Sequence, residues 1–518
     1  MRKAVVLISF LSVFQVYAQD EFLRTWNELM LSRPVVTAQA IPIKLALTDA
    51  VNIGNSAIRY FEGKNDFRDA FMPEKQQGFD VRSERFVSVN GWNFYGRFSF
   101  SKYEDSGSRF TAMADPYREN PYKIADSVEA DWRKQHYLLE TKIVSPLLFR
   151  KFRAGLGMRY EIRNGARQRD PRPLDKIVEI ELTPYVLYHI NPKWTLGLNG
   201  YYFRFREDLS VSLENTQRPR NIYKLLGLGE YLYNGPVILT GGVSRLYKGN
   251  SFGSGISVAY TPGESQFIQA GVQYKKHDED VTDGTSSPFY AGNHKYSNFD
   301  LRVDYLVSGS RMSHRISLDY NHFNTDNTEF IQQFNNTTGQ NEVLYASEMH
   351  HRTKDRWTLD YSGLRKDVQK RLLWGWDVSG NLYDHTETYP TTQSRREMTG
   401  YEVQLGGRRW IYLKQTSVEV GYQTLYRNSL ESAMVYFPGT ASTDFVAANI
   451  TFPNFYYENM PAWTNRLYMQ VNLPYLNNKG SQLYIRASYE RISALENNAY
   501  YTSGLHNNGM MVTVGLYN

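Results

Sequence analysis

The amino-acid sequence predicts an all-β protein whose strands close into a transmembrane antiparallel up-and-down β-barrel. Three observations predict it: apolar and polar residues alternate along most of the chain, short turns alternate with long polar loops, and the chain carries 40 Tyr, 27 Phe and 9 Trp. Strands of a transmembrane barrel alternate in this way because one face meets lipid and the other a polar lumen. Closure pairs every backbone group and leaves no edge strand.

Residues 1–18 have the layout of a secretory signal peptide. Positive charges at Arg2 and Lys3 precede an apolar run that ends in small residues, so we expect cleavage after Ala18. The apolar run is too short for a membrane-spanning helix. The chain has no cysteine, which excludes a disulfide framework. No later stretch offers the roughly 18 uncharged apolar residues that a helical membrane protein needs.

Residues 19–53 form a separate N-terminal segment, either periplasmic or lumenal. The segment is too short for the folded plug domain that a TonB-dependent receptor carries inside its barrel. Its stretch "PVVTAQAIPIKLALTDAV" is apolar and partly alternating, which would suit a small hatch in the lumen. The preferred interpretation is a periplasmic tail tethered to the wall.

The stretch "GWNFYGRFSFSKYED", residues 91–105, illustrates the strand pattern. Trp92, Phe94 and Phe98 fall on one face, and Asn93 and Arg97 fall on the other. One such strand does not distinguish a protein core from a bilayer, but the pattern recurs behind a signal peptide. We therefore expect the aromatic face to meet lipid. The same alternation is found at residues 152–163, 299–307, 372–382, 467–473 and 483–489.

The connections set the number of strands in the barrel, which we expect to span residues 54–518. Each short turn joins two strands, and one further strand lies at each end, so we predict about 20 strands, with a range of 16–22. Long polar segments at 104–132, 278–294, 325–350 and 429–462 are then extracellular. The short turns, which are then periplasmic, are at 90–91, 145–151, 191–193, 234–236, 262–265, 308–310, 365–370, 410–414 and 474–480.

The last segment, "GMMVTVGLYN", ends the chain as a strand with Val512 and Val514 on one face. Outer-membrane barrels commonly finish on an aromatic residue, whereas here Tyr517 is followed by Asn518. In aromatic composition, loop style and termini, the chain resembles large outer-membrane barrels of Bacteroidota, including a family without an assigned activity. The resemblance spans roughly residues 54–518, rests on pattern rather than on a diagnostic motif, and implies a Gram-negative outer membrane.

Charged side chains on the polar faces are expected to line the lumen. They could select a solute by its charge, or they could pair across neighbouring strands and stiffen a wide, wet barrel. The two signs are mixed, which favours pairing. These residues are Arg97, Arg159, Glu161, Glu179, Glu181, Asp300, Arg302, Asp304, Asp319, Asp360, Asp377, Glu402 and Arg408.

The long loop at residues 436–463 is rich in aromatic side chains. Exposed aromatics in an extracellular loop would contact a partner protein or stack on a sugar ring or another flat ligand. Alternatively, they fold inward and pack on the barrel mouth, and the sequence favours neither arrangement. The candidate contact residues are Tyr436, Phe437, Phe445, Phe452, Phe455, Tyr456, Tyr457 and Trp463.

Signals for catalysis, metals and cofactors are poor. No G-x-S-x-G motif is present, and Ser254 in Gly253-Ser254-Gly255 suits a flat strand better than a nucleophile elbow. His350 and His351 are adjacent and point to opposite faces if they lie on a strand, so we expect no metal site there. No cofactor motif occurs. The net charge of +6 is spread out, so no nucleic-acid partner is expected.

Two functions from different classes follow from these observations. The leading hypothesis is a barrel that allows or assists solute passage across the outer membrane, together with surface lipoproteins or a TonB-dependent transporter. The alternative is a non-conducting scaffold that docks such partners through its aromatic loops. A rim-sited barrel enzyme is less favoured, and we predict that the protein is not an enzyme. Apart from these proteins, the expected partner is the lipid of the outer membrane.

Overall fold

The computed structural model describes residues 19–48, 52–215, 220–233, 242–413, 416–438, 445–475 and 481–518. The expected signal peptide, residues 1–18, and the short turn at 234–236 lie outside these ranges.

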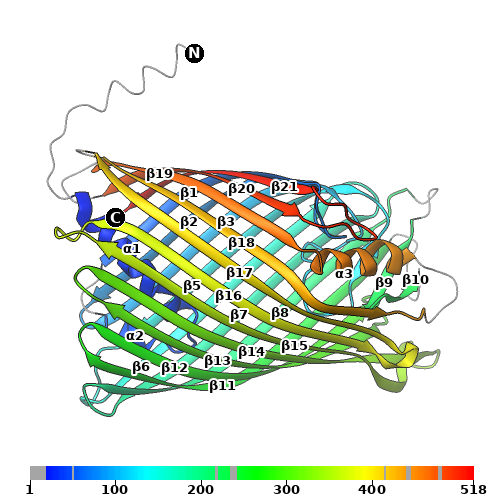
Figure 1. Ribbon diagram of the computed structural model, residues 1–518. Coiled ribbons are helices and arrows are strands. Elements are labelled where there is room, and N and C mark those ends of the chain that lie inside the picture. Colours follow the sequence, from blue (N-terminus) through cyan, green and yellow to red (C-terminus); the bar gives the residue numbers. More distant parts are fainter. Residues whose placement is uncertain are drawn as a thin grey trace.

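The wall of the barrel is one closed antiparallel sheet of 18 strands (Figure 1). Neighbouring wall strands follow chain order, and the last strand pairs with the first, so no edge is left unpaired. The strands are β1 (Asn52–Asn65), β2 (Lys75–Val89), β3 (Trp92–Ser108), β5 (Ala130–Val144), β6 (Phe152–Arg167), β7 (Arg172–His189), β8 (Trp194–Ser212), β11 (Gly242–Gly263), β12 (Gln266–Asp283), β13 (Phe289–Ser308), β14 (Met312–Asn335), β15 (Gln340–Lys366), β16 (Leu372–Tyr389), β17 (Ser394–Leu413), β18 (Thr416–Val435), β19 (Ala462–Tyr475), β20 (Gln482–Ala494) and β21 (His506–Tyr517).

The wall has two strands fewer than the 20 predicted, within the predicted range. Three further strands, β4 (Ile124–Asp126), β9 (Ile222–Gly227) and β10 (Glu230–Tyr233), form a separate small sheet. The prediction had treated the segment before residue 234 as part of the wall. Strands of three to six residues are too short for this role, because a bilayer-spanning strand needs about 9–11 residues.

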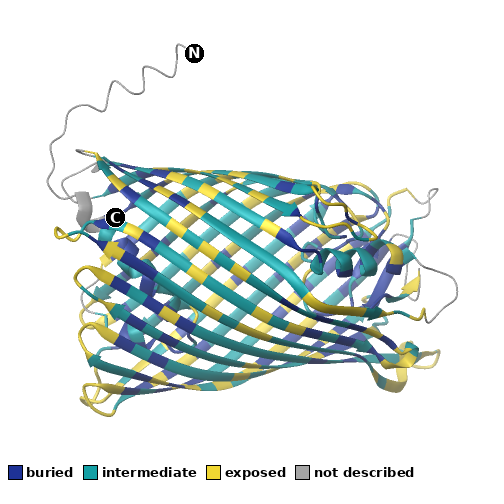
Figure 2. Cartoon of the chain, viewed as in Figure 1, coloured by how far each residue is buried: buried dark blue, intermediate teal, exposed yellow. Residues whose placement is uncertain are grey.

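The outer surface of the wall carries an apolar belt. Exposed and buried positions alternate along the strands (Figure 2), and every wall strand carries at least one exposed large apolar side chain. Ile58 on β1, Leu198 on β8 and Leu359 on β15 are each more than half exposed. Near the short turns the belt ends in aromatic pairs such as Trp194 and Tyr260, whose ring centroids lie 4.4 Å apart. Such a continuous surface suits lipid rather than water.

The turn between β2 and β3 shows how the sequence sets the short connections. Asn90 and Gly91 both have positive φ, at 50° and 79°. An Asn-Gly pair favours this two-residue hairpin turn because both residues tolerate the left-handed conformation. Among the described helices, none is long and apolar enough to cross a bilayer.

The N-terminal segment lies inside the barrel at the short-turn end (Figure 1). Helices α1 (Gln19–Thr37) and α2 (Ile43–Ala46) pack against inward side chains from strands around most of the ring, from Tyr95 on β3 to Trp410 on β17. The periplasmic tail preferred from the sequence therefore does not describe residues 19–48. Many of the apolar side chains from Leu23 onward, such as Leu31, Val35 and Ile43, are buried in the lumen. We call residues 19–48 the plug.

The long loops close the opposite end. Residues 109–129 with β4, residues 222–233 with β9 and β10, and residues 445–461 with the short helices η2 (Ala447–Thr451) and α3 (Phe452–Glu458) pack together there. We call these three segments the cap. A 3₁₀ turn, η1 (Pro390–Thr392), joins β16 to β17. The plug and the cap thus lie in the lumen at opposite ends of the barrel.

Candidate functional site

The plug is held at the C-terminus of α1 by one lysine of the wall. The Nζ of Lys142, on β5, donates to the carbonyl oxygens of Val36, Thr37 and Gln39 at 3.0, 3.0 and 2.8 Å. Carbonyls at a helix C-terminus have no partner within the helix, and a cation there also opposes the helix dipole favourably. Lys142 thus satisfies three acceptors that would otherwise be buried and unpaired.

Other wall strands hold the rest of the plug. The side-chain amide of Gln39 donates to Asp304 on β13 at 2.9 Å, and Gln269 on β12 donates to the carbonyl oxygen of Ile41 at 2.8 Å. Asn93 on β3 donates to a carbonyl oxygen of α2 at 2.8 Å. The contacts come from several sides of the ring, so the plug spans the lumen between distant strands of the wall.

Replacing Lys142 by methionine is expected to loosen the plug. Three buried carbonyl groups would lose their donor, at a cost of about 1–3 kcal/mol. We expect amide hydrogen exchange in residues 35–48 to accelerate roughly tenfold or more. Lys102→Met is the control, because Lys102 is an exposed residue on the outward face of β3. Unchanged protection in Lys142→Met would contradict this role.

The cap crosses the lumen and is fixed by a buried arginine. The Arg118 guanidinium donates to Glu279 on β12 at 2.6 and 2.7 Å and forms an ion pair with Glu207 on β8. It also lies 3.7 Å from the ring centroid of Phe205. Asn120 donates to the same Glu279 carboxylate at 2.7 Å. One loop residue therefore joins two strands of the wall.

The neighbouring Glu119 reaches β15, on the far side of the ring from β3, where this loop begins. Its carboxylate accepts from Arg352 at 2.9 Å and from Lys354 at 2.8 Å. Burial alone would raise the pKa of Glu119, but Lys354 and Arg352 lower it to about 2. The contact is therefore fully present above the ordinary glutamate pKa of about 4.3 and is lost as the pH falls from there to about 2.

Ser251, His277 and Glu279 form a hydrogen-bonded row beneath the cap. The Ser251 hydroxyl lies 2.7 Å from His277 Nδ1, and His277 Nε2 lies 3.1 Å from Glu279. These residue types can activate a nucleophile. Here, however, the Ser251 side chain is fully buried, and Glu279 is shared with Arg118. The row therefore contributes to the cap's polar network and is closed to substrates in this structure.

A cavity of about 610 Å³ remains inside the barrel mouth, between the cap and the wall. Such a volume falls in the range of small-molecule sites, about 300–1,000 Å³. Strands β1, β2, β3, β5, β6 and β20 form its wall side. The facing side is formed by residues 114–117 and α3 of the cap, together with residues 69–73 of the connection between β1 and β2. Aromatic and charged side chains share the lining, among them Tyr103, Tyr117, Asp105, Lys134 and Arg163.

A second cavity of about 300 Å³ continues along the wall. Both cavities are lined by Asn65, Gln76 and Glu490. Gly63 on β1 and Gly509 on β21 are direct partners across the sheet and both line the second cavity. A Cβ atom would meet nothing nearer than 3.5 Å at Gly63 and 3.9 Å at Gly509. The two glycines thus leave space for the second cavity at this point of the wall.

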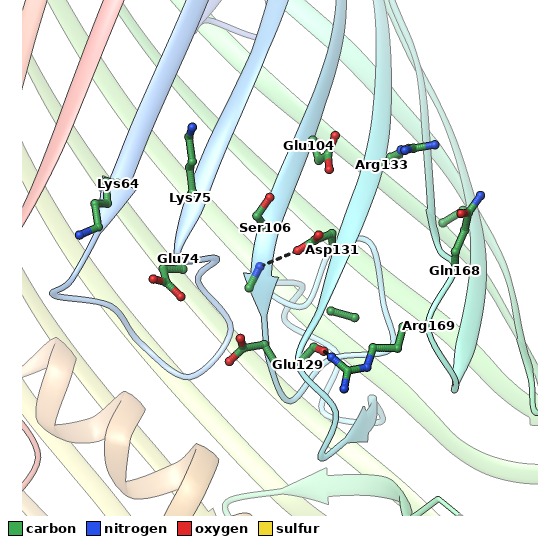
Figure 3. A pocket seen from close by; sticks show the side chains of 13 residues that line it. Lys64, Glu74, Lys75, Glu104, Ser106, Glu129, Asp131, Arg133, Gln168 and Arg169 are labelled. Atoms are coloured by element: carbon green, nitrogen blue, oxygen red, sulfur yellow. Dashed lines mark hydrogen bonds between the residues drawn. The ribbon is translucent and has the colours of Figure 1, made fainter. Parts of the chain in front are cut away.

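A third concavity, of about 540 Å³, lies on the outer face of the wall (Figure 3). Lys75 and Glu104 line it, and sheet alternation puts them on the same face as the exposed Phe79. The Gly107 amide donates to Asp131 here at 2.9 Å. The change from apolar to charged side chains marks the edge of the apolar belt at the long-loop end, and the concavity lies on the outer face, so it is not part of the lumen.

The thirteen charged residues predicted to line the lumen lie on the inner face, and most are paired with other side chains. For example, Arg302 donates to Asp319 at 2.8 Å. Asp360 and Asp377 accept hydrogen bonds from neutral side chains, Arg408 lies over the Trp410 ring, and Glu181 makes no such contact within the described part of the chain. The residues in ion pairs are Arg97, Arg159, Glu161, Glu179, Asp300, Arg302, Asp304, Asp319 and Glu402.

The aromatic residues of 436–463 mostly pack inward. Phe445 stacks on Tyr223 of β9 at 4.5 Å between ring centroids, and Tyr457 packs against Phe67 at 4.6 Å. Phe455 is buried. Within the same loop, Tyr436 meets Phe452 edge-on at 5.9 Å between ring centroids. Tyr456 lies 5.3 Å from Tyr500, which is in the connection between β20 and β21. About half of the surface of the Phe437 and Trp463 side chains stays exposed.

His350 and His351 point to opposite sides of β15. His350 Nε2 lies 2.7 Å from Glu387 in the buried network under the cap, whereas His351 Nδ1 lies 2.9 Å from Asp326. Among the described residues, no group of three His, Asp or Glu side chains is arranged to hold a metal ion. Ser254 lies in the middle of β11, paired with Tyr274, and not at a turn.

Residues 42–518 match a protein family of unknown function, DUF6850. The chain belongs to this family. The match agrees with the resemblance to a barrel family without an assigned activity. A search of curated proteins found no relative of the chain.

Several solved structures are similar in outline. They include the ferric yersiniabactin uptake receptor FyuA from Yersinia pestis, at 8% identity and a TM-score of 0.43, covering 90% of this chain and 80% of that one. The outer membrane transporter YddB from Escherichia coli is 6% identical with a TM-score of 0.39, covering 91% and 81%. The toluene transporter TbuX from Ralstonia pickettii is 10% identical with a TM-score of 0.33, covering 92% and 91%.

Proposed function

We propose that this protein is an outer-membrane barrel that admits a small polar solute through a gated passage, with the plug as the gate on the periplasmic side. One observation carries the proposal: a cavity with a mixed polar and aromatic lining remains at the mouth and continues along β1, β20 and β21, while a plug that belongs to the same chain occupies the opposite end of the lumen. A steady open pore is not expected, because the plug and the cap both cross the lumen.

The contacts of the plug suit a segment that can move out of the lumen. It is a single segment joined to the wall only before β1, and its polar contacts with the wall are separate hydrogen bonds and ion pairs such as Glu28 with Lys366 at 2.7 Å. Its buried apolar side chains, for example Trp26 and Ile41, each add about 1.5–3 kcal/mol to seating. Release of the plug therefore costs free energy, which a periplasmic partner or a ligand-linked change at the cap would supply.

Docking to surface lipoproteins or to a TonB-dependent transporter belongs to the same proposal, and one feature supports a partner. The hairpin of β14 and β15 extends beyond its neighbours, and near its tip Ile331, Leu344 and Tyr345 are about 60% exposed. Exposed apolar surface of this kind favours protein contact. The scaffold hypothesis, in which the aromatic loops dock such partners, needs no passage, so conductance separates the two.

The test compares the full chain with a variant lacking residues 19–48 in planar bilayers. We expect the mature full chain to be silent or to open only briefly, and the variant to show a steady ionic conductance, because the plug spans the lumen between distant strands of the wall. Migration of the unheated, folded barrel on gels verifies that the variant has closed correctly. A folded variant that stays silent would overturn the gated passage and favour the scaffold.

A further inference from the structure

The charged side chains that line the cavity at the barrel mouth favour some classes of ligand over others. Its carboxylates and cations are already engaged: Lys134 pairs with Asp105 at 2.9 Å, and Arg163 pairs with Asp115. Glu490 accepts from Arg466 at 2.8 Å. A charged ligand would have to separate one of these partly buried pairs, which is costly, whereas a neutral ligand leaves them intact.

The paired groups still have hydrogen-bonding capacity. A carboxylate offers about four lone-pair sites, and Asp105 uses two of them on Lys134 and on Gln76, which donates at 2.8 Å. Asp69 accepts from the Tyr117 hydroxyl at 3.0 Å. The remaining lone pairs accept from hydroxyl groups, and the Lys134 and Arg163 side chains donate to them. A ligand rich in hydroxyls uses both, because each hydroxyl is donor and acceptor.

Aromatic rings supply the second half of the site. Phe71 and Tyr117 lie on the side facing the wall with ring centroids 6.1 Å apart. Tyr103 lies on the wall, and its ring centroid is 6.3 Å from that of Phe61, which lines the second cavity. Flat apolar faces thus run from the mouth into the passage. They suit a ligand that is itself flat and apolar on its faces and polar on its edge.

From this combination we propose that the cavity binds a neutral oligosaccharide. A pyranose ring presents C–H groups on its faces and hydroxyls on its edge, which matches aromatic faces flanked by paired carboxylates and amides. The two connected cavities give room for more than one ring along the wall. The inference rests on the proposed passage for its role in the cell, but binding itself needs no passage.

The test is binding to the full chain in detergent, with the plug in place. A glycan array of neutral and acidic oligosaccharides would identify the preferred sugar, and titration calorimetry would then measure its affinity. We expect neutral glycans to be preferred, Tyr103→Ala to weaken binding by about tenfold or more, and Tyr103→Phe to keep most of it, since the ring is retained. Tyr137→Ala is the matched control, because Tyr137 is an exposed tyrosine on the outward face of β5.

Preference for acidic glycans, no binding to any neutral glycan, or equal affinity of Tyr103→Ala and the native protein would overturn the proposal. These outcomes are independent of the conductance test. A barrel that conducts after removal of the plug but binds no sugar would retain the passage and lose the saccharide. A barrel that binds sugar but never conducts would keep the saccharide site and lose the passage.

Discussion

Arg118→Met should release the cap from the wall. The substitution keeps the length of the side chain but removes the guanidinium that the buried Glu207 and Glu279 share. Breaking a buried ion pair from one side costs about 3–5 kcal/mol, because the remaining carboxylates stay buried without their cation. The two carboxylates also repel each other across β8 and β12 once the guanidinium is gone.

Chymotrypsin is the measurement for Arg118→Met, since it cleaves after residues such as Tyr117 and Tyr122 in the same loop. We expect rapid cleavage there in the variant and slow cleavage in the native protein. Arg109→Met is the control: Arg109 lies in the same loop, but the side chains of both Arg109 and its partner Glu129 are more than 40% exposed, so the ion pair adds about 1 kcal/mol or less. Equal resistance of Arg118→Met and the native protein would show that the cap is held by other contacts.

Gly509→Trp should block the passage. A side chain at this position points into the second cavity, and its Cβ meets nothing nearer than 3.9 Å, so the barrel can fold around it. We expect the conductance of the barrel lacking residues 19–48 to fall about tenfold, because an indole fills most of a constriction of this size.

Gly380→Trp is the matched control for that experiment. Gly380 lies on the outward face of β16, next to the exposed Val378 and Leu382, and a Cβ there meets nothing within 4 Å. The same bulky residue is then added to the lipid side, and conductance should not change. If Gly509→Trp conducts as well as Gly380→Trp, ions take a route elsewhere in the lumen.

The wall was predictable from the sequence because the pattern that defines its strands, alternating apolar and polar residues, involves only near neighbours in the chain. Trp92 and Arg97 fall on opposite faces by counting residues, and an Asn-Gly pair sets the turn before them. The plug was not predictable in this way. Leu23, Val35 and Ile43 are apolar, but an apolar side chain can be buried in a lumen or against another surface. The neighbouring residues do not indicate which side chains these three contact.

Inward packing of the aromatic loop at 436–463 was one of two arrangements left open, but the part of the cap at residues 109–129 was missed for a related reason. The loop "DPYRENPYK", residues 115–123, reads as a polar connection, yet Arg118 finds its partners 89 and 161 residues away. Charge alternation between two prolines was the only local signal, and many exposed loops share it. The cavity could not be foreseen either, because it exists only where the wall and the cap fail to meet.

The N-terminal helix also lies beside β21, the last strand of the wall. Trp26 contacts the ring of Tyr517, with centroids 5.8 Å apart, and the Gly54 amide donates to the Asn518 carbonyl at 2.6 Å. The seam between β1 and β21 joins segments separated by almost the whole chain, which makes it a late and slow event in assembly. A barrel whose seam is still open lacks part of the seat for Trp26, so correct seating of that tryptophan reports completed biogenesis.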